Sequence, residues 1–64
     1  MIIKPGDVHD NPEKARLGVG LAAEALGIEC NLKLQSMWMV KVDGNELKTF
    51  LEFAREFANN PEGK

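Results

Sequence analysis

Hydrophobic side chains recur along this chain with two different periods, and the change of period divides the chain into elements. In residues 28–42 they alternate with polar ones, because Cys30, Leu32, Leu34, Trp38, Val40 and Val42 all occupy even positions. A period of two is typical of strands that bury one face. In residues 12–26 and 47–58 the apolar positions recur every three or four residues, which indicates two amphipathic helices.

Local signals predict the ends of the first helix. Asn11 is a good N-cap, Pro12 suits the first helical position, and Gly27 stands where a left-handed C-cap belongs. The expected buried face consists of Ala15, Gly18, Val19, Ala22, Ala25 and Leu26. These residues are small, so we expect the helix to lie close to the element it covers, most naturally a sheet. Gly18 and Gly20 should serve this close approach or a function.

The second helix follows turn residues, with Asp43 or Asn45 as its N-cap. Its apolar arc consists of Leu47, Phe50, Leu51, Phe53, Ala54, Phe57 and Ala58. We therefore expect three phenylalanines and Trp38 to supply most of the core. Asn59-Asn60-Pro61 should end the helix, and residues 61–64 should form a flexible tail.

Two arrangements keep the even positions of residues 28–42 on one face. A hairpin with a loop at residues 35–37 would pair Leu34 with Trp38, Leu32 with Val40 and Cys30 with Val42. One strand of about 13 residues, about 40 Å long, is the alternative, and it would suit pairing with another chain. We favour the hairpin, although its loop lacks the Gly or Asn that such turns prefer.

A short apolar start at residues 1–3, stopped by Pro5-Gly6, adds a first strand. The order β-α-β-β-α predicts an α+β fold, a small two-layer sandwich in which two helices cover one face of a three-stranded sheet. Residues 1–60 should form this single domain. The odd-numbered face of the sheet would then be uncovered, and it carries Met37 and Met39.

These two methionines are the candidate interface residues. A chain of 64 residues hides a modest share of its surface, and its single cysteine excludes an intramolecular disulfide. We therefore expect a homo-oligomer or a protein partner to supply further burial at this face.

Composition removes several functional classes. A net charge of −2, with no basic stripe, argues against a nucleic-acid partner. No apolar run approaches the roughly 18 residues of a membrane span, so we expect no membrane partner. The lone cysteine and the absence of a recognisable secretion signal favour a cytoplasmic location.

Candidate chemistry is sparse, and we expect no cofactor. Asp7, His9 and Asp10 precede the first helix and could hold a ligand or a divalent cation, although helix capping explains them as well. Cys30 sits at an inward strand position, as a small buried hydrophobe would. Gly18 and Gly20 match a dinucleotide fingerprint by letter but should lie within the helix, where they would serve packing.

Two stretches resemble known families. His9-Asp10-Asn11-Pro12 resembles the active-site stretch of the histidine phosphocarrier proteins, although Asn11 stands where that family has an arginine. Residues 1–36, with Asn-Pro-Glu-Lys-Ala opening a helix and Ala-Leu-Gly-Ile-Glu closing it, look like the opening unit of the DsrE-like sulfur-relay family. Cys30 does not match the catalytic cysteine of that family, so the resemblance implies part of a fold and no activity.

The sequence therefore favours a non-catalytic binding, regulatory or self-assembling module that works through its open sheet face. The alternative is a small carrier or enzyme that uses either the loop of Asp7, His9 and Asp10 or the thiol of Cys30, in a sulfur-relay-like or metal-binding role.

Overall fold

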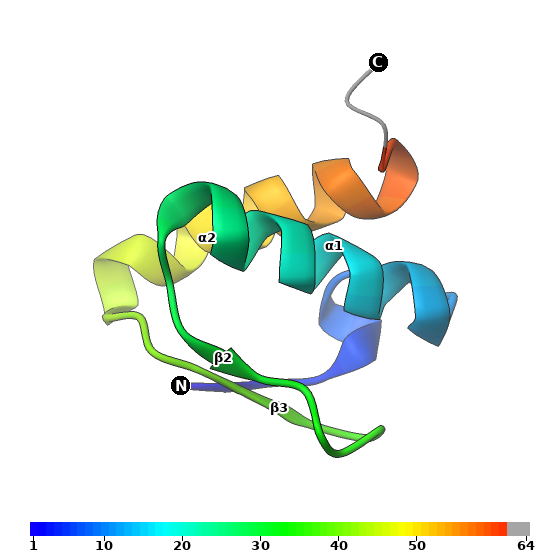
Figure 1. The fold of residues 1–64 in the computed structure, drawn as a ribbon, viewed down its shortest axis with the longest axis horizontal. Coiled ribbons are helices and arrows are strands. Elements are labelled where there is room, and N and C mark those ends of the chain that lie inside the picture. The colour runs from blue at the N-terminus through cyan, green and yellow to red at the C-terminus, as the bar shows by residue number, and fades with distance from the viewer. Residues whose placement is uncertain (62–64) are drawn as a thin grey trace.

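A computed structural model describes residues 1–61 and confirms the order of elements predicted from the sequence (Figure 1). The elements are β1 (Ile2–Ile3), the 3₁₀ turn η1 (Pro5–Asp7), α1 (Pro12–Leu26), β2 (Cys30–Asn31), β3 (Trp38–Val40) and α2 (Gly44–Asn59). Both helices lie on the same side of the sheet, as expected for the small α+β fold. The turn η1 was not predicted, and the proposed tail at residues 61–64 lies outside the described residues apart from Pro61.

The three strands form an antiparallel sheet with β3 in the middle. Ile2 and Ile3 of β1 pair with Met39 and Trp38 of β3, and Cys30 of β2 pairs with Val40 on the other side. Because β2 and β3 are neighbours and antiparallel, the hairpin is confirmed and the single long strand is excluded.

The register predicted for this hairpin is wrong by two residues. Cys30 pairs with Val40 instead of Val42, and Leu34 is exposed instead of facing Trp38 across a tight turn. The strands end earlier than expected because the side chain of Asn31 accepts a hydrogen bond from the Lys33 N–H at 3.0 Å, which turns the chain. A longer loop, residues 32–37, then needs no left-handed residue, in keeping with its lack of glycine.

Both helices begin and end where polar side chains and a glycine satisfy their termini. The Asn11 side chain accepts hydrogen bonds from the first turn of α1, and Gly27 takes the left-handed C-cap with φ 66°. At α2 the N-cap is Asp43, whose carboxylate accepts from the Glu46 N–H at 2.8 Å, so Asn45 is not the cap.

The face of α1 that consists of small residues packs chiefly against α2. The prediction that this face would lie closest to the sheet is therefore wrong. A Cβ atom placed on Gly18 would overlap the Ala54 carbonyl oxygen and lie 2.8 Å from the Ala58 Cβ. The buried residues of α1 are Ala15, Gly18, Val19, Ala22 and Ala23. The predicted members Ala25 and Leu26 are exposed and Ala23 replaces them, because α1 is covered by α2 on one side and by the sheet on another.

The aromatic contribution to the core is smaller than predicted. Phe50 is fully buried and Trp38 is 2% exposed, but Phe53 is 38% exposed and Phe57 only half-buried. The rings of Phe53 and Phe57 meet edge to face at the rim, 6.4 Å apart. Aliphatic residues complete the core, including Ile3 of β1 and Val8 after η1.

Candidate interaction surface

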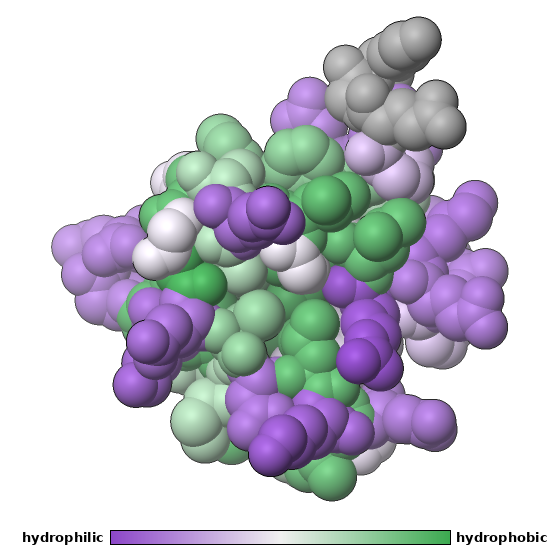
Figure 2. Space-filling view, in the orientation of Figure 1, coloured by the Kyte–Doolittle hydropathy of each residue, from purple (hydrophilic) through white to green (hydrophobic). Residues whose placement is uncertain are grey.

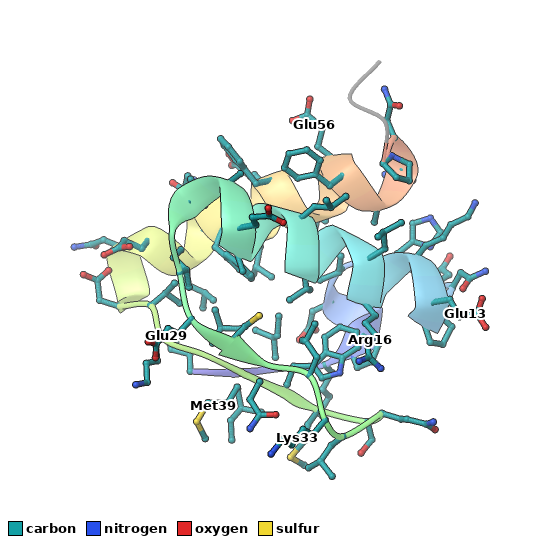
Figure 3. All side chains as sticks on the ribbon, in the orientation of Figure 1. Glu13, Arg16, Glu29, Lys33, Met39 and Glu56 are labelled. Atoms are coloured by element: carbon teal, nitrogen blue, oxygen red, sulfur yellow. The ribbon has the colours of Figure 1, made fainter. Side chains whose placement is uncertain are left out.

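The alternation of side chains along the strands leaves one face of the sheet uncovered. Trp38 and Val40 are buried beneath the helices, whereas Met39 between them is 54% exposed. In β1, Ile3 is buried and Ile2 is 61% exposed. Because Ile2 lies opposite Met39, the two form an apolar row across the outer face. Figure 3 shows Met39 projecting from the sheet on the side away from the helices.

The loop between β2 and β3 extends this apolar row. Its residues Leu34 and Met37 are both exposed, and with Ile2 and Met39 they line a shallow groove of about 270 Å³. We name these four side chains the open sheet face. Contiguous exposed apolar side chains are a feature of interaction sites in folded proteins, which makes this face a candidate site.

Two hydrogen bonds hold the loop in place beside the sheet. The buried indole of Trp38 donates its Nε1–H to the Leu34 carbonyl oxygen at 2.7 Å, and the Asn31 side chain turns the chain at Lys33. The loop backbone is therefore fixed at Leu34 by a core side chain, while the Leu34 side chain remains 60% exposed.

Lysine side chains lie around the open sheet face. Lys33 lines the groove and projects from the same side of the sheet as Met39 (Figure 3). Lys41 follows Met39 by two residues and forms a salt bridge of 3.0 Å with Glu29. Both partners of this pair are well exposed, so the bridge adds little to stability and leaves its charges accessible to solvent.

Apolar side chains are also exposed on the helices, and Figure 2 shows hydrophobic surface across that part of the molecule. Leu17 of α1 is 47% exposed, and Leu26 and Phe53 are less so. Leu17 is more exposed than Met37, but it lines a separate groove with the half-buried Leu21 and Leu32. The open sheet face instead joins four exposed apolar side chains in one groove. The open sheet face is therefore the stronger candidate for contact with another molecule.

The loop before α1 uses two of the three predicted ligand residues for local hydrogen bonds. The carboxylate of Asp7 accepts from the Lys4 N–H at 3.0 Å, which closes η1. The Nδ1 atom of His9 accepts a hydrogen bond from the Asn11 N–H at 2.9 Å.

Asp7, His9 and Asp10 do not assemble into a metal site. Within residues 1–61, no group of three or more His, Cys, Asp or Glu side chains is arranged to hold a metal ion. Asp7 and His9 instead form hydrogen bonds with nearby backbone N–H groups of the loop, and the N-cap of α1 is Asn11.

Cys30 lies in β2, half-buried, with its side chain packed against the core. Burial raises the pKa of its thiol, which disfavours the thiolate that nucleophilic chemistry requires. The environment of Cys30 is that of a small hydrophobe, as the sequence predicted.

The two glycines that match the dinucleotide fingerprint, Gly18 and Gly20, lie inside α1, six and eight residues after its first residue Pro12. Gly18 contacts α2, and a Cβ on Gly20 would have ordinary van der Waals contact with Leu32. Neither glycine stands in a turn after a strand, which phosphate binding by this motif requires. Both were correctly placed in the helix from the sequence.

Sequence reasoning placed Met37 and Met39 on the outer face but missed Ile2 and Leu34. Alternation implied that one of Ile2 and Ile3 would point outward, but only the pairing with β3 decides which one. Leu34 was expected inside because it shares the even positions of Trp38 and Val40. The early end of β2 removes it from that alternation.

Comparisons with protein-family models, with curated proteins and with solved structures found no match to this chain. Among residues 1–61, the structure contains no helix of the length and hydrophobicity that crossing a membrane needs.

Proposed function

We propose that this protein is a non-catalytic interaction module that binds a second protein chain through its open sheet face. The observation that carries the proposal is the apolar row of Ile2 and Met39, continued by Leu34 and Met37 on the uncovered side of the sheet. Covering these side chains would remove apolar surface from water, which is the main driving force of protein association.

The alternative role as a small carrier or enzyme has less support. The raised pKa of the Cys30 thiol is the opposite of what a sulfur carrier needs, and the Nδ1 atom of His9 is engaged with the backbone. A reducing compartment such as the cytoplasm suits a lone thiol, and we propose that location for the interaction.

Site-specific photocrosslinking in living cells tests the proposed surface. A photoreactive amino acid replaces Met39 in one version of the protein and Leu17 in a matched control, since both positions are exposed and lie on different parts of the molecule. We expect a discrete crosslinked product from position 39 and none from position 17. Absence of a product from position 39, or the same product from both positions, would contradict the proposal.

The carrier alternative is tested in the same cells. His9→Ala and Cys30→Ala should leave the crosslink from position 39 unchanged, because neither side chain belongs to the open sheet face. Loss of the crosslink in either variant, with the thermal stability of that variant unchanged, would favour the carrier role instead.

A further inference from the structure

The open sheet face is apolar in its middle and positively charged around it. Ile2 pairs with Met39, and the chain stays extended at Lys4, so the same register brings Lys4 level with Met37. The side chains of Lys4 and Ile2 then share one face, because they are two residues apart on an extended backbone.

A second lysine lies beside the groove on the side of β2. Lys33 follows Asn31, the last residue of β2, by two positions, and it lines the same groove as Met37. Lys33 lines the groove and points away from the helices (Figure 3). Lys4 and Lys33 therefore both lie near Met37, while Lys41 follows Met39 toward the opposite end of the face.

The charge of this face is opposite to that of the rest of the chain. Lys4, Lys33 and Lys41 against Glu29 leave two positive charges, although the whole chain has a net charge of −2. The remaining surface therefore carries a net charge of −4. Asp7 is the acidic residue that follows Lys4 in η1. Its carboxylate accepts a hydrogen bond from the Lys4 backbone N–H, and its side chain does not line the groove.

A second copy docked face to face would suit this surface poorly. It would set the lysines of one copy against those of the other, and like charges across an interface cost free energy. The groove is also small, with a volume of about 270 Å³. A short segment with negative charges fits both the size and the charge of the groove.

We propose that the open sheet face binds a short acidic segment of another protein that also carries apolar side chains. The apolar groups would contact Ile2, Met37 and Met39, and the carboxylates would lie near the three lysines around the face. This inference rests on the proposed function, because it names the class of partner for the same surface.

Selection from a random library of displayed 12-residue peptides tests the partner chemistry. The full chain serves as bait in three forms: wild type, Lys4→Glu/Lys33→Glu, and a matched control, Lys14→Glu/Lys48→Glu, which makes the same charge change on the helices. Wild type and control should select peptides several-fold enriched in Asp and Glu together with Leu, Ile or Phe. The variant at the sheet face should lose that enrichment and shift toward Lys and Arg.

A measurement on unmodified protein does not depend on the folding of any variant. The best selected peptide, labelled with a fluorophore, should bind the wild type at least tenfold more weakly at 500 mM than at 50 mM salt, because salt screens exposed charges. Selection of no peptides, of basic peptides, or of the same acidic peptides by the Lys4→Glu/Lys33→Glu protein would overturn the inference.

The test separates this inference from the proposed function. If the crosslink at position 39 forms but acidic peptides are not selected, the surface binds a chain of different chemistry and the inference alone is wrong. If sedimentation shows a dimer that Met37→Gln/Met39→Gln dissociates, the occupant is a second copy, which also overturns the inference while leaving the proposed function intact.

Discussion

Ile2 of β1 lies directly opposite Met39 of β3, and both side chains point away from the helices into solvent. Their neighbours Ile3 and Trp38 form the next pair and are buried on the inner face. The same two strands therefore build the core on one side and an apolar surface on the other. Burial of the inner pair, Ile3 and Trp38, stabilises the fold. Folding alone does not explain why the exposed outer pair is apolar.

Gly18→Ala should destabilise the protein, although alanine is the better helix former. The added Cβ would collide with the Ala54 carbonyl oxygen and Ala58, so the helices would have to separate. Overpacking of this kind costs about 1 to 3 kcal/mol. Urea denaturation followed by circular dichroism measures the free energy of unfolding.

Gly20→Ala is the matched control for this prediction. A Cβ at Gly20 would meet Leu32 at 3.9 Å, which is ordinary contact, so the gain in helix propensity should stabilise the protein by about 0.5 to 1 kcal/mol. Equal effects of the two substitutions would show that α1 and α2 do not approach each other at Gly18.

Phe50→Ala and Phe53→Ala should lower the free energy of unfolding by clearly different amounts. Phe50 is fully buried, so its loss should cost about 3 to 5 kcal/mol, enough to unfold much of so small a domain. Phe53 lies at the rim and should cost about 1 to 2 kcal/mol. Thermal denaturation of both variants under the same conditions measures the difference, and similar losses would contradict the assignment of Phe50 to the core.

Asn11→Ala should weaken the start of α1 by about 1 kcal/mol, since its side chain accepts from the N–H groups of Glu13 and Lys14. Asn11→Asp should retain most of the stability, because a carboxylate accepts the same hydrogen bonds and suits the positive end of the helix dipole. An alanine variant as stable as the wild type, measured by urea denaturation, would argue against this cap.

Stability should fall in alkaline solution because of Cys30. Burial raises the pKa of this thiol in the folded protein, so the folded state keeps the proton longer than the unfolded state does. The contribution of the protonated Cys30 thiol to the free energy of unfolding is complete below the ordinary thiol pKa of about 8.5, and it is lost as the pH rises above that value and through the raised pKa of the folded state. The melting temperature of the wild type should drop more between pH 7.5 and pH 9.5 than that of Cys30→Ala, and an equal drop would contradict the burial of the thiol.

The sequence was sufficient for the elements whose signals are local. Asn11 and Gly27 mark the ends of α1, Asp43 was one of the two predicted caps of α2, and alternation places Trp38 and Val40 inside. Each of these depends on hydrogen bonds or side-chain direction within a few residues. For the same reason Met37 and Met39 could be assigned to the outer face.

The parts that depend on pairing between distant segments could not be predicted. The hairpin register follows from the bonds of Asn31 and Trp38 in a loop without glycine, and the exposure of Ile2 follows from its pairing with β3. The close contact of Gly18 with α2 requires knowing which helix face meets which. The pattern of hydrophobic and polar residues does not indicate the hairpin register, the pairing of β1 with β3, or the helix faces that meet.

The open sheet face should be covered by a second protein chain in the cell. Size-exclusion chromatography of a gentle cell extract, with the protein at its natural level, tests it most directly. The wild type should elute well above its 7.1 kDa mass, and Met37→Gln/Met39→Gln should elute as the monomer, while the control Leu17→Gln behaves as the wild type. Elution of the wild type as a monomer, or of the double variant with the wild type, would contradict the claim.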